Sequence, residues 1–329
     1  MTATAPDIAA VRRLRQRLQP WLIPTPVVRC VNLEPRLGGG TTIVAKLEFL
    51  QRTGTFKPRG ALSVMLGLGR EQLLAGVTAV SAGNHAIATA FAAQAVGTSA
   101  KVVMIASANP LRVERCRHFG AEVVLAADAH SAFALAEQIR IAEDRYFVHP
   151  FEGPDVILGT ATVGLEICEQ VPQFDAVVVP IGGGGLCAGV ASVVKQLHPE
   201  CEVYGVEPEG ADSMHRSFAA GQPQSIDKVR TIADSLGAPF ALPLSYALCR
   251  ANVDSLVLVS DDELRAAMGV LFTDLKVAVE PACAASTAAL MGPLSRTLTG
   301  KRVVLVLCGS NIDWPSYERE ARLGLSRAA

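Results

Sequence analysis

The sequence has 329 residues, 50% of them hydrophobic, with 30 basic and 31 acidic side chains and a formal net charge of −1. A chain of this length can bury a full core, and we expect two domains. The balanced charge leaves no excess of basic residues that would indicate nucleic-acid binding, and no apolar run is long enough to cross a membrane. We therefore expect a small-molecule partner and neither a nucleic-acid nor a membrane partner.

The hydrophobic pattern alternates between strands and helices along the chain. Apolar residues at helical spacing predict helices, and short runs rich in valine and leucine predict buried strands. The predicted strands are 42–49, 77–80, 101–106, 122–126, 146–148, 176–181, 202–206, 256–259 and 302–307. The predicted helices are 8–18, 58–68, 84–96, 111–119, 131–144, 158–170, 186–197 and one opened by a capping box of Ser260 and Glu263.

This alternation predicts an α/β fold with open, mostly parallel twisted sheets and helices on both faces. In such folds ligands bind beyond the carboxyl ends of the strands. Three polar or glycine-rich loops follow predicted strands, at Ser81–His85, Gly182–Gly185 and Cys308–Asn311. Because the three loops point to the same edge independently, we expect a ligand site there.

Lys57 stands in an unusual setting for a lysine. It follows Phe56, precedes Pro58 and is bracketed by Gly54 and Gly60. Proline pushes the residue before it towards an extended conformation, so we expect an extended Lys57 at the mouth of a helix. A fixed, partly desolvated amine has a lowered pKa and can act as a nucleophile, a Schiff-base former or a base. The alternative is a turn with a solvated amine.

Four consecutive glycines, 182–185, join a predicted strand to a predicted helix. Backbone N–H groups and a helix N-terminus in this arrangement can bind a phosphate. A P-loop is excluded because no Lys-Ser/Thr follows, and Cys187 occupies the last glycine position of a dinucleotide fingerprint. The loop therefore predicts a compact phosphate ligand. The alternative is a glycine-rich turn that only tightens the junction.

The eight cysteines show no C-x-x-C spacing. This usage is typical of reduced thiols in the cytoplasm and predicts neither a disulfide framework nor a zinc site.

Five motifs in order resemble one known family. They are Thr55-Phe56-Lys57-Pro58-Arg59-Gly60-Ala61, Ser81-Ala82-Gly83-Asn84-His85, Gly182 to Leu186, Val279-Glu280-Pro281 and Leu307-Cys308-Gly309-Ser310-Asn311. The chain resembles the fold-type II pyridoxal-phosphate enzymes of the serine/threonine dehydratase group, which includes serine racemase. Cysteine and threonine synthases are less similar, because they place Asp where Pro58 stands. The resemblance implies a tryptophan synthase beta-like fold, a large domain of residues 1–66 and 152–329, a small inserted domain of residues 67–151, and a homodimer.

The resemblance also assigns roles to single residues. Lys57 would bind pyridoxal 5'-phosphate as a Schiff base, with Phe56 packed beneath. Asn84 would donate to the phenolic oxygen, and Cys308 would face the pyridine nitrogen. The backbone would bind the phosphate at Gly182, Gly183, Gly184, Gly185 and Leu186. The substrate carboxylate would bind the turn formed by Ser81, Ala82, Gly83, Asn84 and His85, in which we interpret His85 as structural. Arg59 is interpreted as a buried structural partner.

The implied reaction is the α,β-elimination of water from a β-hydroxy amino acid, giving a 2-oxo acid and ammonia. Cys308 offers only a weak hydrogen bond to an unprotonated pyridine nitrogen, which favours elimination over a long-lived carbanion. Ala82 stands where the related racemases carry a proton-exchanging serine, so we expect a dehydratase rather than a racemase. L-Threonine and L-serine are the expected substrates.

Other hypotheses stay open at this point. They are an amino-acid racemase, a dehydratase of 3-hydroxyaspartate or phenylserine, a pyridoxal-phosphate carrier or regulatory protein without turnover, and a phosphosugar-binding protein without this cofactor. Some relatives hold a divalent cation (Mg, Ca or Mn) at positions that correspond to Glu207, Ala211 and Ser213. Ser213 replaces a carboxylate there, which lowers the expected affinity for a hard cation.

Overall fold

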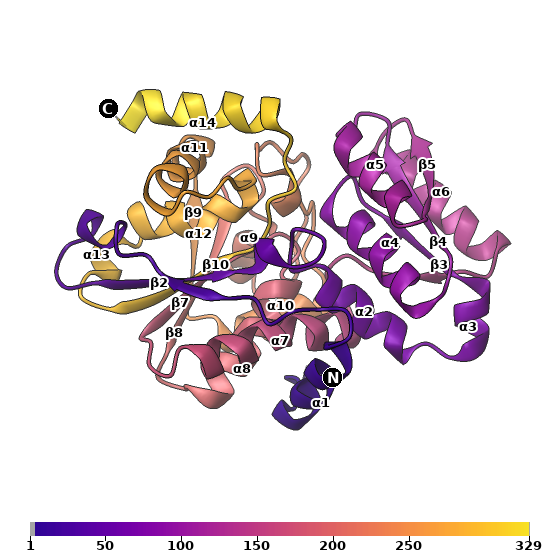
Figure 1. The fold of residues 1–329 in the computed structure, drawn as a ribbon, viewed down its shortest axis with the longest axis horizontal. Coiled ribbons are helices and arrows are strands. Elements are labelled where there is room, and N and C mark those ends of the chain that lie inside the picture. The colour runs from indigo at the N-terminus through magenta and orange to yellow at the C-terminus, as the bar shows by residue number, and fades with distance from the viewer. Residues whose placement is uncertain (1–3, 329) are drawn as a thin grey trace.

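The computed structural model describes residues 4–328, which form two separate sheets with helices packed around each (Figure 1). The strands are β1 Val27–Arg29, β2 Thr42–Leu47, β3 Val77–Val80, β4 Ala100–Ile105, β5 Glu122–Ala126, β6 Tyr146–Phe147, β7 Ala176–Pro180, β8 Glu202–Pro208, β9 Ser255–Val259 and β10 Arg302–Leu307. The helices are α1 Ile8–Leu18, α2 Pro58–Gly67, α3 Arg70–Ala75, α4 Asn84–Val96, α5 Pro110–His118, α6 Ala129–Ala142, α7 Pro154–Gln170, α8 Gly185–Leu197, α9 Ser213–Ala220, α10 Pro243–Asn252, α11 Asp261–Val270, α12 Pro281–Met291, α13 Ser295–Leu298 and α14 Trp314–Ala328.

The larger sheet has six strands in the order β1-β2-β10-β7-β8-β9. Only β1 runs antiparallel to its neighbour, and all other pairings in this sheet are parallel. In Figure 1, α8 and α10 lie on one side of the sheet, with α11, α12 and α14 on the other. The buried valines of β7 and β10 form the centre of its core. Strands covered on both faces read as continuous apolar runs, which explains why the sequence pattern located them.

The smaller sheet has four parallel strands in the order β5-β4-β3-β6. We call this sheet, together with the helices α4, α5 and α6 that pack on it, the smaller lobe. Its core cluster also includes Leu14 and Leu18 of α1 and Leu62 of α2. The predicted α/β fold with two mostly parallel sheets is confirmed. The division into domains at residues 66/67 and 151/152 stays a prediction. Helices α1 and α2, which this division places in the large domain, pack against the core of the smaller lobe.

Helix α7 connects the two elements that matter most for the site, since it packs against both α2 and α8. Helix α2 begins directly after Lys57, and α8 begins in the glycine loop. The side chains of α7 are buried along most of its length. Because α7 packs against both helices, it fixes the distance between Lys57, which precedes α2, and the glycine loop at the start of α8.

Several predicted bounds differ from the structure. The strand predicted for 42–49 ends at Leu47, because a short 3-10 turn, Glu48–Leu50, follows it. No sequence pattern indicated β1, α3, α9, α10, α12, α13 and α14. The capping box of Ser260 and Glu263 is present, with Ser260 N donating to Glu263 Oε2 at 2.7 Å.

Within residues 4–328, none of the helices combines the length and hydrophobicity that a membrane span requires.

Candidate active site

The three loops singled out in the sequence follow β3, β7 and β10, and all three meet at one cavity. Each contributes lining residues, and Lys57 enters from the start of α2. The cavity is lined by Phe56, Lys57, Asn84, Phe151, Pro180, Gly182, Gly183, Gly184, Gly185, Leu186, Ser235, Leu236, Glu280, Ala282 and Cys308. The structure therefore brings together every cofactor-binding residue that the resemblance assigned.

Lys57 directly precedes α2 with helical backbone angles, φ −53° and ψ −35°. The predicted extended conformation is wrong, because the carbonyl of Lys57 already accepts the helical hydrogen bond of Ala61 N at 3.2 Å. Its Nζ donates to the carbonyl of Pro150 at 2.7 Å. Burial of the amine lowers the pKa of Lys57 to about 8. The uncharged, nucleophilic form is thus accessible near neutral pH.

The glycine loop leaves bare backbone at the start of α8. Gly184 has a φ of +95°, which side-chain-bearing residues rarely adopt. A Cβ at Gly183 would lie 2.1 Å from the ring of Phe151, so a side chain has no room there. The loop also lies at the positive end of the α8 dipole. These features suit an anion that approaches the backbone closely.

Asn84 belongs to a buried hydrogen-bond network with Glu280 and Asn311. Its Nδ2 donates to Glu280 Oε1 at 2.6 Å, and its Oδ1 accepts from Asn311 Nδ2 at 2.7 Å. Asn311 N donates to Glu280 Oε2 at 3.1 Å. Burial raises the pKa of Glu280. The network fixes which end of the Asn84 amide faces Glu280 and Ser235, whose Oγ lies 3.2 Å from Nδ2.

The turn from Ser81 to His85 opens α4 beside this network. Ser81 Oγ accepts a hydrogen bond from Gly83 N at 3.1 Å. His85 is buried, and its Nε2 lies 2.8 Å from the carbonyl of Val148. Burial lowers the pKa of His85 to about 3, so the imidazole ring is neutral. Its contact with the carbonyl of Val148 holds the turn against the residue that follows β6. The binding of a substrate carboxylate at this turn stays a prediction.

Cys308 lines the same cavity as the glycine loop and is buried. A hydrogen bond with Cys283, together with burial, raises the pKa of Cys308 well above its usual range. The thiol is therefore neutral. The carbonyl of Cys308 accepts from Phe56 N at 3.2 Å, which ties the end of β10 to the lysine segment.

Arg59 lies beneath the site in a buried cluster of four charges, which also includes Lys46, Glu48 and Glu166. Its guanidinium donates to Glu48 Oε2 at 2.8 Å and to Glu166 Oε1 at 2.7 Å. Lys46 Nζ donates to Glu166 Oε2 at 2.6 Å. The interpretation of Arg59 as a buried structural partner is confirmed by these contacts.

The positions considered for a cation lie at the start of α9. Both carboxylate oxygens of Glu207 accept backbone N–H groups, from Met214 at 2.9 Å and His215 at 2.6 Å. Burial raises the pKa of Glu207 to about 8. Among the described residues no group of three or more His, Cys, Asp or Glu side chains could hold a metal ion. Glu207 serves here as the acceptor for the first turn of α9.

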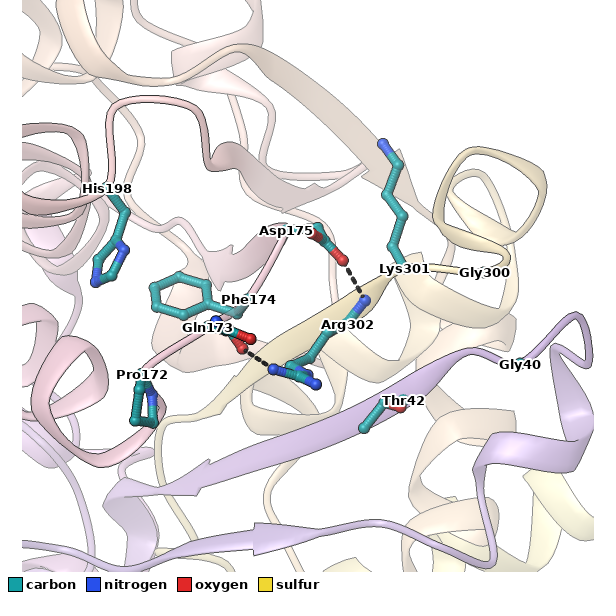
Figure 2. Close-up of a pocket in the computed structure, with 10 residues that line it drawn as sticks. All are labelled: Gly40, Thr42, Pro172, Gln173, Phe174, Asp175, His198, Gly300, Lys301 and Arg302. Carbon is teal, nitrogen blue, oxygen red and sulfur yellow. Dashed lines mark hydrogen bonds between the residues drawn. The ribbon is translucent and has the colours of Figure 1, made fainter.

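A second hollow of about 520 Å³ lies at the opposite, amino ends of β2, β7 and β10 (Figure 2). Arg302 N donates to Asp175 Oδ2 at 2.7 Å, and Arg302 Nη1 donates to the carbonyl of Gln173 at 2.8 Å. Lys301 pairs with Glu202. These polar groups therefore have hydrogen-bond or ion-pair partners, and the hollow lies at the end of the sheet opposite to the cavity of Lys57.

Some residues of the cavity were not assigned by sequence reasoning. Glu280 and Asn311 stood in recognised motifs, but their pairing with Asn84 spans about two thirds of the chain and leaves no local signal. Phe151 lies in a loop and Ser235 in a short 3-10 helix, Asp234–Leu236, and neither segment carries a motif. The sequence around Phe151 carries no signal that its ring packs against Gly183.

A family model described as "Pyridoxal-phosphate dependent enzyme" matches residues 18–309. A phenylserine dehydratase from Ralstonia pickettii is 55% identical over 98% of this chain and 98% of its own length. The catabolic L-threonine dehydratase of Escherichia coli (strain K12) is 38% identical over 91% of each chain. The solved structure of maize serine racemase is 32% identical, covers 99% of both chains and superposes with a TM-score of 0.91.

Proposed function

The chain belongs to the family of pyridoxal-phosphate dependent enzymes, and on that premise we propose that it is a dehydratase (ammonia-lyase) of β-hydroxy amino acids. It would remove water from the substrate and yield a 2-oxo acid and ammonia. The observation that carries the proposal is the meeting of a half-buried, low-pKa lysine and a bare glycine loop in one cavity. Family membership sets aside the phosphosugar-binding alternative.

The residues present fit pyridoxal phosphate. Lys57 offers the amine that would hold the cofactor's aldehyde carbon, and the backbone from Gly182 to Leu186 would hold its phosphate. The loop has no side chain that could block an anion, and a Cβ at Gly183 would collide with Phe151. Asn84 would bind the phenolic oxygen, and Cys308 would face the ring nitrogen across the cavity. Phe56 would pack against the ring.

When bound, pyridoxal phosphate withdraws electrons from the α-carbon of an amino acid, so that the α-proton becomes acidic. Lys57 Nζ would take this proton, and its lowered pKa makes the free amine available for the task. The electron pair of the broken C–H bond would form the Cα=Cβ bond as the C–O bond to the β-hydroxyl breaks. The leaving hydroxyl would take up the proton that Lys57 removed, so that water is lost and Lys57 is again uncharged. The released enamine then hydrolyses to the oxo acid and ammonia.

Cys308 supports elimination over reactions that need a long-lived carbanion. A neutral, buried thiol is a weak hydrogen-bond donor and cannot keep a facing nitrogen protonated as a carboxylate would. Electron withdrawal in this site is therefore modest. Loss of a β-leaving group carries the electron pair away from the α-carbon, whereas racemisation must keep it there until a proton returns.

Racemisation is the second candidate reaction, because maize serine racemase shares the fold over the whole chain. It requires a proton carrier on each face of the α-carbon. Ala82, in the turn that precedes α4, has no exchangeable proton. We therefore propose that water loss is the main reaction.

For the substrate, we place an aromatic β-hydroxy amino acid of the phenylserine type ahead of L-threonine and L-serine. The 55% identical relative is named for phenylserine, whereas the relative named for L-threonine is 38% identical. 3-Hydroxyaspartate is a further candidate, since a 35% identical relative from Saccharomyces cerevisiae is named for it.

The proposal is tested with a panel of 3-phenylserine, L-threonine, L-serine and 3-hydroxyaspartate. Ammonia, oxo acid and the enantiomeric composition of the remaining substrate are measured together on the cofactor-loaded protein. We expect equal amounts of ammonia and oxo acid, with the highest kcat/KM for phenylserine. Racemised substrate without ammonia would favour the second candidate, and no product from any substrate would refute both.

We also propose a homodimer in the cytoplasm. Edge strand β1 and the residues around it expose apolar side chains, with Val28 44% and Val31 55% accessible, which suits a protein contact. The eight cysteines are all buried and free, which is in keeping with a reducing compartment. Light scattering on the purified protein measures the oligomeric state directly.

A further inference from the structure

Arg112 joins the smaller lobe to the rest of the chain at the active site. It lies on α5, in the smaller lobe (Figure 1), and only 7% of the residue is exposed. Its partners belong to segments that follow residue 230. The guanidinium forms an ion pair with Asp234, donates from Nε to the carbonyl of Asn311 at 3.0 Å and lies 3.8 Å from Glu280 Oε2.

The same guanidinium packs against the turn that opens α4. A Cβ at Gly83 would lie 2.9 Å from Arg112 Nη1 and 3.3 Å from its Cζ. The arginine thus fills the space in which any side chain at position 83 would stand. Arg112 therefore lies in contact with the turn, and two residues of that turn, Asn84 and His85, line the hollows around Lys57.

The charge on Arg112 is permanent. Burial alone would lower its pKa, but the nearby carboxylates of Asp234, Glu280 and Asp313 outweigh burial and raise the pKa of Arg112. Asp234 is more than half exposed on its side chain, at 56%, so water screens much of its negative charge. Burial raises the pKa of Glu280, which weakens that carboxylate as a counter-ion. Arg112 therefore stays charged, and its positive field at the turn is opposed by Asp234, Glu280 and Asp313.

An amino-acid substrate brings a carboxylate that needs such a field. Among the described residues that line the two neighbouring hollows around Lys57, Lys57 is the only lysine or arginine. Its amine is committed to the cofactor and the α-proton. Backbone N–H groups and the N-terminus of α4 offer a partial positive charge, and Arg112, which lies outside the lining, is a full cation in contact with this turn.

We propose that Arg112 is a positioning residue for the substrate carboxylate: it supports the turn from Ser81 to His85 and supplies the positive charge that this turn presents to the carboxylate. Asp234 holds the guanidinium in place. This inference rests on the proposed function, because it takes the carboxylate to bind at the turn.

The test compares ligands that differ only in the carboxylate. L-Phenylalanine and 2-phenylethylamine form one pair, and L-alanine and ethylamine form another; none of the four carries a β-hydroxyl to eliminate. Each is titrated into the cofactor-loaded protein, and the change in cofactor absorbance gives its dissociation constant. Arg112→Met should weaken binding of the two amino acids by about 10- to 100-fold. Binding of the two amines should change by less than about threefold.

Two further variants separate charge from structure. Arg112→Lys keeps the charge but loses the planar fork, so it should lose less affinity for the amino acids than Arg112→Met. Arg115→Met, one turn along α5, removes the bond to Asn311 Oδ1 at 2.7 Å without touching the turn, and should leave all four ligands within about threefold.

The proposal is overturned if Arg112→Met weakens amines and amino acids equally, if it weakens neither, or if the lysine variant is as impaired as the methionine variant. Because none of the ligands turns over, these titrations do not depend on the dehydratase reaction. If the substrate panel releases no ammonia, the proposed function fails while the role of Arg112 is still decided by the ligand pairs. Thermal unfolding of each loaded variant verifies that the fold is intact.

Discussion

Replacing Arg59 by methionine should destabilise the protein strongly, although the side chain never reaches the cavity. All five N–H groups of Arg59 are used, on Glu48, Glu166 and Thr162. Arg59→Met keeps much of the volume but leaves two buried carboxylates with Lys46 as their one cation in the cluster. Removing one partner of a buried ion pair costs about 3–5 kcal/mol. We expect a loss of this size in the free energy of unfolding.

The assay is urea unfolding followed by circular dichroism, with Arg322→Met as the matched control. Arg322 is 79% exposed on its side chain and pairs with Glu318 at 2.6 Å on the surface of α14. Exposed pairs contribute about 0.2–1 kcal/mol, so the control should barely move the midpoint. A loss for Arg59→Met no larger than that of the control would contradict the reasoning.

The deficit should also depend on pH. Burial alone would raise the pKa of Glu166, but Arg59 and Lys46 outweigh it and hold that pKa below its usual range. A lowered carboxyl pKa stabilises the fold above the unfolded pKa, and this contribution is lost as pH falls through the folded pKa. In Arg59→Met the pKa of Glu166 should rise. The deficit relative to wild type should therefore be largest at neutral pH and shrink on acidification.

Two more predictions concern the cofactor. Gly183→Ala should raise the dissociation constant of pyridoxal phosphate by at least about tenfold in a spectral titration, because the added methyl group would lie 2.1 Å from Phe151. Gly67→Ala is the control, and it should leave the constant unchanged because the nearest atom to its methyl group would be 4.0 Å away. The rate at which cofactor-free protein binds pyridoxal phosphate should rise with pH and level off above about 8, since the free amine of Lys57 is the reactive form. A rate in stopped-flow absorbance that keeps climbing to roughly pH 10 would instead indicate an ordinary, solvated lysine.

The strands were predictable from short apolar runs with turn signals beside them. The strands 122–126 and 302–307 were predicted with the bounds they have, since each is an apolar run that begins beside a turn signal. Helix α12 escaped because it is alanine-rich and buried on every side, so it has no apolar face to detect. Strand β1 has only three residues, two of them exposed. Neither element carries a periodicity that a sequence pattern could show.

The site was predictable as a set of loops but not as a network. The loops at Ser81, Gly182 and Cys308 follow parallel strands, and the fold alone brings such strand ends together. The backbone of Lys57 was predicted wrongly, because the bias from Pro58 is weaker than the helical hydrogen bond from Ala61. The pairs Asn84–Glu280 and Arg112–Asp234 each join residues more than 100 positions apart, which no local pattern encodes.

The covalent attachment of the cofactor tests the central claim most directly. The loaded protein is reduced with borohydride, digested and analysed by peptide mass spectrometry. We predict one phosphopyridoxyl group, on Lys57, and none on Lys46, whose amine is buried among its own partners. A label on Lys46 or any other side chain, or no label at all, would contradict the account.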